Sequence, residues 1–355
     1  MSFRTHNENK IGTNVLVQFR QSLLLFIFNI KMSYKTFSSL NRPIPLTPSQ
    51  YNYCIPNNKR GLPSKIMGVW SQSNDPWVNG SNSVMNCMYI ASFVSFPNDI
   101  NDLTCEYFTT HFWNYPPVIS NDCIYYISVG GSTLSNWTPL LNLFSANNFQ
   151  YLDKLISILR LYNVNGIDWD YEVSEVNVQS HNAEQLLAIN NYIKKKYTNT
   201  FFIQNTLLFH CYTFNNIILS EPNSYDTVSF MLYATSMYDT NSGAGLNYKQ
   251  WAQFLLGDPN IVNDSSYAFG YTTKEYYKMM GLQQLKPYIT SKLIMALTSD
   301  GGWTNNDWIE FKNTYQSSCK GFAWWRAGTL SKFTNNYINI VMSTNTKNPC
   351  NSSFL

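Results

Sequence analysis

The stretch Val164-Asn165-Gly166-Ile167-Asp168-Trp169-Asp170-Tyr171-Glu172 alternates carboxyl side chains with large apolar ones. In a β-strand, successive side chains point to opposite faces, so Asp168, Asp170 and Glu172 share one face and the apolar side chains share the other. Neighbours on one face of a strand lie only roughly 7 Å apart. The pattern therefore predicts a buried strand that brings three acids together.

Like charges at this spacing, walled by aromatic rings, favour holding at least one proton among them. This supplies a carboxylic acid near neutral pH, which is what a general acid requires. The alternative is a solvated edge strand. The preceding Leu-Tyr-Asn-Val run and the interleaved Ile, Trp and Tyr are untypical of such a surface strand. Perturbed carboxyl groups also tend to gather in functional sites.

Strand-like runs alternate with helix-like segments from Lys65 onward, which is the pattern of repeated βα units around a parallel sheet. The two clearest helical stripes lie in Leu140–Leu161 and Ala183–Lys196. The strand candidates are Ile66–Trp70, Cys87–Phe96, Ile124–Val129, Gly166–Tyr171, Phe201–Leu208, Val228–Tyr233, Lys292–Leu297 and Gly321–Trp325. We predict the α/β class and a single-domain (β/α)8 TIM barrel over residues 64–345, with working residues at the carboxyl ends of the strands.

Four short motifs resemble those of the family 18 glycoside hydrolases, the chitinases and their relatives. Asn165–Glu172 is similar to the family's Asp-Gly-x-Asp-x-Asp-x-Glu, and Ser128–Gly131 matches its Ser-x-Gly-Gly. Met231–Tyr233 matches Met-x-Tyr of the sixth strand, and Gly321–Trp325 matches Gly-x-x-x-Trp of the eighth. The motifs come in the family's order and span roughly residues 64 to 345.

The resemblance implies a substrate-assisted retaining mechanism, in which the N-acetyl group of the substrate replaces a carboxylate nucleophile. Glu172 would be the acid and then the base, and Asp170 would hold the acetamide N–H. Asp168 would share a proton with Asp170. Tyr233 would donate a hydrogen bond to the acetamide oxygen. Trp325 would form the floor of the sugar-binding site, although Trp324 is the alternative for the inward-facing position.

The remaining candidates are residues at or beyond predicted strand ends, which could bind sugar along a cleft. Ser128 is expected to donate a hydrogen bond beneath the carboxyls. The candidate substrate-binding residues besides Trp325 are Trp70, Trp137, Trp303, Met231, Gly130 and Gly131. Aromatic rings also fill cores, so stacking on sugars is a hypothesis for these tryptophans.

The sequence departs from the family at two positions. Asn165 replaces the usual first Asp, which removes a charge beside the acids. Ala234 stands where the family commonly has Asp or Asn after the sixth-strand Tyr, and Asp239 is a possible substitute. Neither change removes the proton donor. About two dozen residues separate Leu297 from Gly321, so we expect no large inserted lobe after the seventh strand and an open cleft.

Composition argues against several other functions. The chain has 355 residues, a net charge of +3 and only 13% charged residues, so no nucleic acid is expected as a partner. Lys194-Lys195-Lys196 is the only basic triplet and is expected to end a helix.

The seven cysteines have no C-x-x-C and no metal-ligand spacing with the four histidines, so we expect no metal and no cofactor. Cys87 and Cys123 are expected in buried strands. Four cysteines fall in polar loops and could pair in an oxidising compartment: Cys54, Cys105, Cys319 and Cys350.

Residues 1–63 form an N-terminal extension, and residues 346–355 form a tail. A basic region followed by the apolar Ser22–Ile30 is typical of a signal peptide, and Met32 is an alternative start. The apolar run is shorter than the roughly 20 residues of a membrane span. We expect a secreted or lumenal monomer without stable membrane insertion.

The leading hypothesis is an endo-acting hydrolase of chitin, the polymer of β-1,4-linked N-acetylglucosamine, with chitin or its oligosaccharides as partner. One alternative is an endo-β-N-acetylglucosaminidase acting on N-glycans. The other is a chitin-binding lectin with weak or lost catalysis, a loss that usually shows as loss of the Glu that is present here as Glu172.

Overall fold

The computed structural model describes residues 62, 65–71, 88–92, 96–111, 124–162, 164–173, 175, 180–232, 248–263, 267–268, 271–298 and 305–325. All of them belong to one compact unit, Pro45–Leu355. The predicted limits at residues 63 and 345 fall outside the described residues and stay predictions.

Eight parallel strands close into a barrel in the order β1-β10-β9-β6-β5-β4-β3-β2, and β2 pairs with β1. The strands are β1 (Ile66–Ser71), β2 (Met88–Ser92), β3 (Ile124–Gly130), β4 (Val164–Tyr171), β5 (Phe202–Leu207), β6 (Thr227–Met231), β9 (Leu293–Thr298) and β10 (Gly321–Trp325). Each corresponds to one predicted strand, which confirms the predicted α/β barrel.

Both faces of these strands are covered, which explains their nearly continuous apolar sequences. All six residues of β5 are buried, and β4 is buried at every position except Asn165. One face points into the barrel and the other packs under the helices. A buried strand of this kind has no solvated face, so its polar residues stand out in the sequence.

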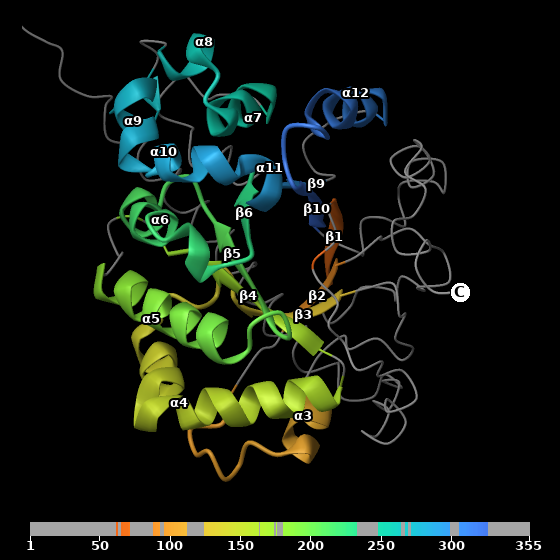
Figure 1. Cartoon of the computed structure of the whole chain (residues 1–355), viewed down its shortest axis with the longest axis vertical. Coiled ribbons are helices and arrows are strands. Elements are labelled where there is room, and N and C mark those ends of the chain that lie inside the picture. Colours follow the sequence, from red (N-terminus) through yellow and green to blue (C-terminus); the bar gives the residue numbers. More distant parts are fainter. Residues whose placement is uncertain are drawn as a thin grey trace, which may run out of the picture. The chain divides into compact units, whose positions relative to one another are not determined.

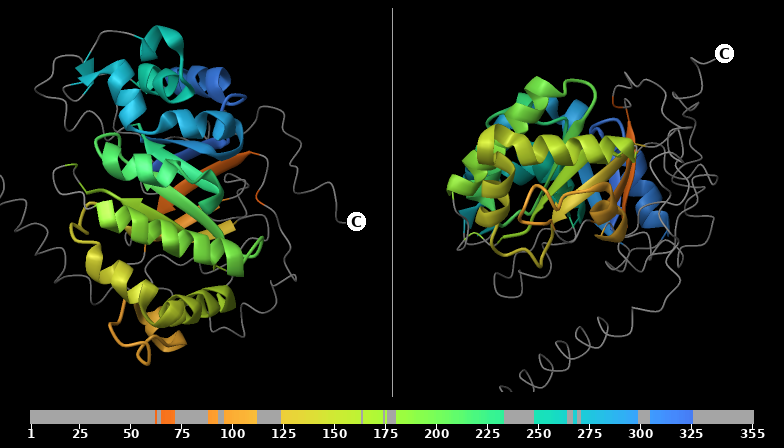
Figure 2. Two further views of the ribbon diagram at one scale, coloured as in Figure 1. Left: turned by 60° about the vertical axis from the view of Figure 1, so that its left-hand side comes forward. Right: turned by 90° about the horizontal axis from the view of Figure 1, so that it is seen from below.

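Helices cover the outside of the strands, and α4, α5 and α6 lie side by side in chain order (Figures 1 and 2). These helices are α3 (Cys105–His111), α4 (Thr138–Leu161), α5 (Ser180–Lys196) and α6 (Tyr212–Leu219). Helix α4 is broken inside, because Ala146 is extended and Asn147, Asn148 and Phe149 have positive φ. The predicted stripe 140–161 therefore belongs to two helical pieces.

A long connection joins β6 to β9, and its described parts are mostly short helices. They are α7 (Tyr248–Leu256), α8 (Pro259–Val262), the antiparallel pair β7 (Tyr267–Ala268) and β8 (Tyr271–Thr272), α9 (Thr273–Met279), α10 (Leu282–Leu285), a 3-10 turn (Lys286–Tyr288) and α11 (Ile289–Lys292). Between β9 and β10 the described structure is the single helix α12 (Asn305–Tyr315). No inserted lobe occurs among the described residues at that place.

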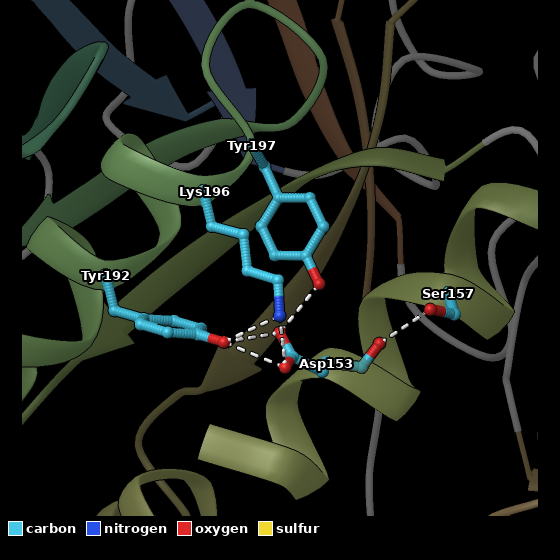
Figure 3. A network of polar contacts seen from close by, with 5 residues as sticks. All are labelled: Asp153, Ser157, Tyr192, Lys196 and Tyr197. Carbon is cyan, nitrogen blue, oxygen red and sulfur yellow. Dashed lines mark hydrogen bonds and ion pairs between the residues drawn. The ribbon is translucent and has the colours of Figure 1, made fainter. Parts of the chain in front are cut away.

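A polar network ties α4 to the end of α5 (Figure 3). The Asp153 carboxylate accepts from Tyr192 Oη at 2.8 and 2.9 Å, from Tyr197 Oη at 2.7 Å and from Lys196 Nζ at 2.5 Å. Ser157 Oγ donates to the backbone oxygen of Asp153 at 2.8 Å. The network lies on the outside of the barrel, where it joins two neighbouring helices.

Candidate active site

Strand β4 places Asp168 and Asp170 on the inner face of the barrel, and Glu172 directly follows the strand. Asp168 is completely buried, Asp170 is 7% exposed and Glu172 is half-buried. The carboxyls thus run from the barrel interior to its carboxyl-terminal mouth. The alternation read from the sequence produces the expected shared face.

The aromatic residues of β4 face outward and fix the strand against the helices. Trp169 Nε1 donates to Asn190 Oδ1 of α5 at 2.8 Å. The Tyr171 ring stacks on Phe214 of α6, with ring centroids 3.6 Å apart and planes 4° apart. These contacts resist any rotation of β4 that would move the acids off the inner face.

Asp168 accepts four hydrogen bonds from three other strands. Its Oδ2 accepts from Trp70 Nε1 at 3.0 Å and Ser128 Oγ at 2.9 Å. Its Oδ1 accepts from Thr206 Oγ1 at 2.6 Å and Gln204 Nε2 at 3.1 Å. Burial raises the pKa of Asp168, and these four donors oppose that shift. The predicted donor role of Ser128 is confirmed.

Asp170 and Glu172 share a hydrogen bond between their side chains, which requires one proton between the two carboxyls. Burial raises the pKa of Asp170 well above the ordinary aspartate value, and the charges of Glu172 and Asp168 raise it further. Burial also raises the pKa of Glu172, against hydrogen bonds from Asp170 and the Ser132 N–H. The pair can therefore keep a transferable proton at a pH where isolated carboxyls are ionised.

The sharing of this proton differs from the sequence expectation, which paired Asp170 with Asp168. In the structure both oxygens of Asp168 are occupied by donors from other strands, whereas Asp170 bonds to Glu172. The second oxygen of Asp170, Oδ1, is buried and has no hydrogen-bond partner among the described residues. A buried acceptor without a partner costs free energy, which a hydrogen bond from an N–H group would recover.

Gly130 and Gly131 let β3 end directly against the acids. A Cβ at Gly130 would lie 2.2 Å from the Asp170 backbone oxygen and 2.4 Å from the Trp137 ring. Gly131 has φ +82°, and a Cβ there would lie 3.7 Å from Asp170 Oδ2 and 3.9 Å from Glu172 Oε1. Gly130 is thus needed for close packing. Gly131 places a backbone without a side chain next to the Asp170–Glu172 carboxyl pair.

The segment after Glu172 is held by the start of α6. Cys211 Sγ donates to the Val173 backbone oxygen. The Glu175 carboxylate accepts from the Thr213 N–H at 3.1 Å and from the Thr213 hydroxyl. These contacts fix the chain on the carboxyl-terminal side of Glu172, which limits the movement of its side chain.

Two tryptophans predicted to stack on sugars, Trp70 and Trp137, are instead buried. Trp137 is fully buried because its ring fills the space that Gly130 leaves, next to Tyr171 at 5.1 Å between centroids. Trp70 is 1% exposed because its N–H reaches inward to Asp168. Neither ring face is open to a ligand in this structure.

The strand register settles which tryptophan of β10 faces inward. Trp325 pairs with Trp70, and paired residues on neighbouring strands point to the same side of the sheet. Trp325 is half-buried, so it lies at the mouth on the side of the acids. Met231 is 3% exposed at the end of β6, whereas Tyr233 and Trp303 lie outside the described residues.

Gln204 and Thr206 of β5, which donate hydrogen bonds to Asp168, were not predicted as site residues. A signal was present in Phe202-Ile-Gln-Asn-Thr-Leu207, where Gln and Thr stand two apart in an otherwise strand-like run. Asn205 between them faces outward and accepts from Asn190 Nδ2 at 3.3 Å. Polar residues at alternate positions of a buried strand indicate an inward polar partner.

Cys105, Cys211 and Cys319 are free thiols. Cys319 lies in the loop between α12 and β10, as predicted, but is completely buried, and Cys105 begins α3 instead of lying in a loop. The other four cysteines lie outside the described residues. Within the described ranges no group of His, Cys, Asp and Glu could hold a metal ion. Among the helices of those ranges, none has both the length and the apolar character needed to cross a lipid bilayer.

No protein-family model and no curated protein sequence matches the chain. Among solved structures, chitinase ChiW from Paenibacillus sp. str. FPU-7 matches with a TM-score of 0.50 and 12% identity, over 78% of this chain and 32% of that one. A family GH18 chitinase catalytic domain from the fern Peteris ryukyuensis matches with a TM-score of 0.48 and 13% identity, over 79% and 98%.

A fungal endo-β-N-acetylglucosaminidase from glycosyl hydrolase family 18 matches with a TM-score of 0.46 and 13% identity, over 80% of this chain and 100% of that one. At such identities likeness to solved structures concerns the fold alone. This chain shares its fold, a closed eight-stranded barrel, with the matched third of the Paenibacillus chitinase.

Proposed function

We propose that this protein is a glycoside hydrolase that cleaves chitin within the chain by a substrate-assisted, retaining mechanism. The observation that carries the proposal is the Asp170–Glu172 pair, which shares a proton at the barrel mouth while burial raises the pKa of both groups. A general acid works best with a pKa near the operating pH. Substrate class and mechanism come from the family resemblance of the motifs.

In the proposed reaction, Glu172 protonates the leaving oxygen while the substrate's acetamide oxygen attacks the anomeric carbon. The bond to the leaving sugar breaks, and a cyclic oxazolinium ion forms. Water then opens this ring, and Glu172 takes the proton of the water. No carboxylate acts as nucleophile, in keeping with the substrate-assisted exceptions among glycosidases.

Asp170 would orient the acetamide through its unpartnered Oδ1, which can accept the acetamide N–H. As positive charge develops on the acetamide, a carboxylate there stabilises the transition state more than the ground state. Tyr233 is proposed as the donor to the acetamide oxygen from its sequence motif alone. Trp325 is proposed as the floor of the sugar site, with Met231 and Gly131 beside it.

The connection between β9 and β10 supports internal rather than terminal attack. Its described part is the single helix α12, so no lobe in that part walls the mouth. An open cleft admits the middle of a polymer. Secretion is proposed from the N-terminal apolar run and would bring such an enzyme to an extracellular polymer.

The test is to incubate the protein with chitin oligomers, with fully deacetylated oligomers and with a high-mannose glycoprotein. We expect cleavage of acetylated oligomers only, with the β-anomer as the first product by NMR. Glycan release from the glycoprotein would favour an endo-β-N-acetylglucosaminidase, and chitin binding without cleavage would favour a lectin. Equal rates on deacetylated oligomers, or inversion, would reject substrate assistance.

A further inference from the structure

The Oδ1 atom of Asp168 faces two neutral donors from β5. Thr206 Oγ1 lies at 2.6 Å and Gln204 Nε2 at 3.1 Å. Gln204 is completely buried and Thr206 is 1% exposed. Burying polar groups at such depth costs free energy unless they are hydrogen-bonded, so the orientation of these two side chains follows from their partners.

The partners fix the direction of each hydrogen bond. Thr227 Oγ1 of β6 donates to Gln204 Oε1 at 3.2 Å, which turns the amide nitrogen toward Asp168. Gln204 Nε2 also donates to Thr206 Oγ1 at 3.2 Å. Because the Thr206 oxygen accepts from the amide, its own proton points to Asp168. Thr227, Gln204 and Thr206 therefore form a relay in which every step donates toward one carboxylate oxygen.

The relay favours an anion, since a carboxylate only accepts hydrogen bonds and a carboxylic acid must place a proton. An amide N–H cannot take up that proton, and Thr206 Oγ1 could accept it through its second lone pair only by turning its own proton away from Asp168. On the other oxygen, Trp70 Nε1 is likewise a donor that cannot accept. Ser128 Oγ is the other hydroxyl that could accept from a protonated Asp168, again only by turning its own proton away.

We propose that Thr227, Gln204 and Thr206 are positioning residues that keep Asp168 ionised, so that the transferable proton is held by Asp170 and Glu172. The catalytic role of these three residues rests on the proposed function, whereas their effect on the charge of Asp168 does not. A fixed negative charge behind Asp170 favours protonation of the neighbouring pair. The β5–β6 side of the barrel thus decides where the proton lies.

The titratable neighbours of Asp168 in the described structure are few. Tyr126 of β3 lies close enough to feel its charge, and Asp170 and Glu172 follow on β4. The sequences of β1, β5, β6, β9 and β10 contain no titratable residue. No cation from these strands competes with the relay in setting the charge of Asp168.

The test is a ¹³C NMR titration of unliganded full-length protein labelled at aspartate Cγ, with the Asp168 signal assigned by its loss in Asp168→Asn. We expect Thr206→Val and Gln204→Met to move the Asp168 midpoint upward by about one pH unit, since each removes a hydrogen bond to the charged form. Thr206→Ser keeps the hydroxyl and should restore the wild-type midpoint. The acidic limb of kcat/KM should move in the same direction.

Ser229→Ala is the matched control, because Ser229 is an inward, completely buried hydroxyl of β6 with no partner among the described residues. It should leave the Asp168 midpoint unchanged. An unchanged midpoint in both folded relay variants, or the same shift in Ser229→Ala, would overturn the relay. If the midpoints move as expected but no substrate is cleaved, the relay stands and the proposed function fails.

Discussion

Asp168 in the barrel and Asp153 on α4 each accept hydrogen bonds from several side chains, yet their acidities move in opposite directions. Asp168 is completely buried, and burial raises its pKa despite four neutral donors. For Asp153, whose side chain is 25% exposed, burial is outweighed by hydrogen bonds from Lys196, Tyr197 and Tyr192, and the pKa is lowered. The charge of the donors and access to water therefore matter more than the number of hydrogen bonds.

The sharpest contrast concerns activity. Glu172→Gln should keep the fold and sugar binding but reduce turnover by about 10³-fold or more, because it removes only the transferable proton. Asp153→Asn, which changes a carboxylate outside the barrel, should leave the rate unchanged. The measurement is hydrolysis of chitin oligomers together with binding by calorimetry. A folded Glu172→Gln protein with substantial activity would rule out Glu172 as the acid.

The second contrast concerns stability when a carboxyl is deleted. Asp168→Ala should lower the free energy of unfolding by about 3 kcal/mol, because it leaves buried donors such as Trp70 Nε1 and Gln204 Nε2 without an acceptor. Denaturant unfolding of the variant and the wild type checks this value. Asp153→Ala is the partly exposed counterpart, and an equal loss of unfolding free energy in the two variants would contradict the role assigned to burial.

The third contrast concerns the pH dependence of stability. The pKa of Asp170 is raised in the folded state, so its ionisation opposes folding as pH rises from the unfolded value of 3.8 through the folded pKa. Asp170→Asn removes this penalty and can still donate to Glu172. The free energy of unfolding of this variant should exceed that of the wild type by about 1 to 2 kcal/mol at neutral pH and should equal it below about pH 4. The variant should have no hydrolytic activity. Thermal unfolding across that window tests the sign.

The smallest effect is expected at the partly exposed Asp153 network on the outside of the barrel. The folded pKa of Asp153 is lowered, so its contribution is present above the unfolded value of 3.8 and is lost as pH falls through the folded pKa. Asp153→Asn should lower the melting temperature by about 1 to 2 °C at neutral pH and by less at pH 3. High salt should shrink the difference, and a difference that grows at low pH would reverse the assigned sign.

Much of the barrel could be predicted because its strands are covered on both faces. Such strands are short apolar runs, and the limits of β10 agree with the prediction at both ends. The connection between β6 and β9 was not predicted as a set of helices. Its helices are only four to nine residues long, too short to show a helical period.

The face of each carboxyl could also be predicted, since alternation along β4 depends only on local geometry. Of the partners of Asp168, Ser128 was predicted as a donor, whereas Trp70 and Gln204, which are 98 and 36 residues away, were not. Which residues stand level across a barrel depends on strand register, and a single sequence carries little information on it. The burial of Trp137 depends likewise on the space that Gly130 leaves.

The two glycines that end β3 should leave different traces in a saturation-mutagenesis library. At Gly130 even the Cβ of alanine would clash with the Asp170 backbone and the Trp137 ring. A screen for folded protein alone should therefore recover no substitution at that position. At Gly131 the surroundings leave room for a Cβ, and only the positive φ selects against it. Substitutions such as asparagine should survive the folding screen at Gly131 and disappear under selection for growth on the substrate. Folding would then restrict substitutions at Gly130, and activity would restrict them at Gly131, although the two residues are adjacent.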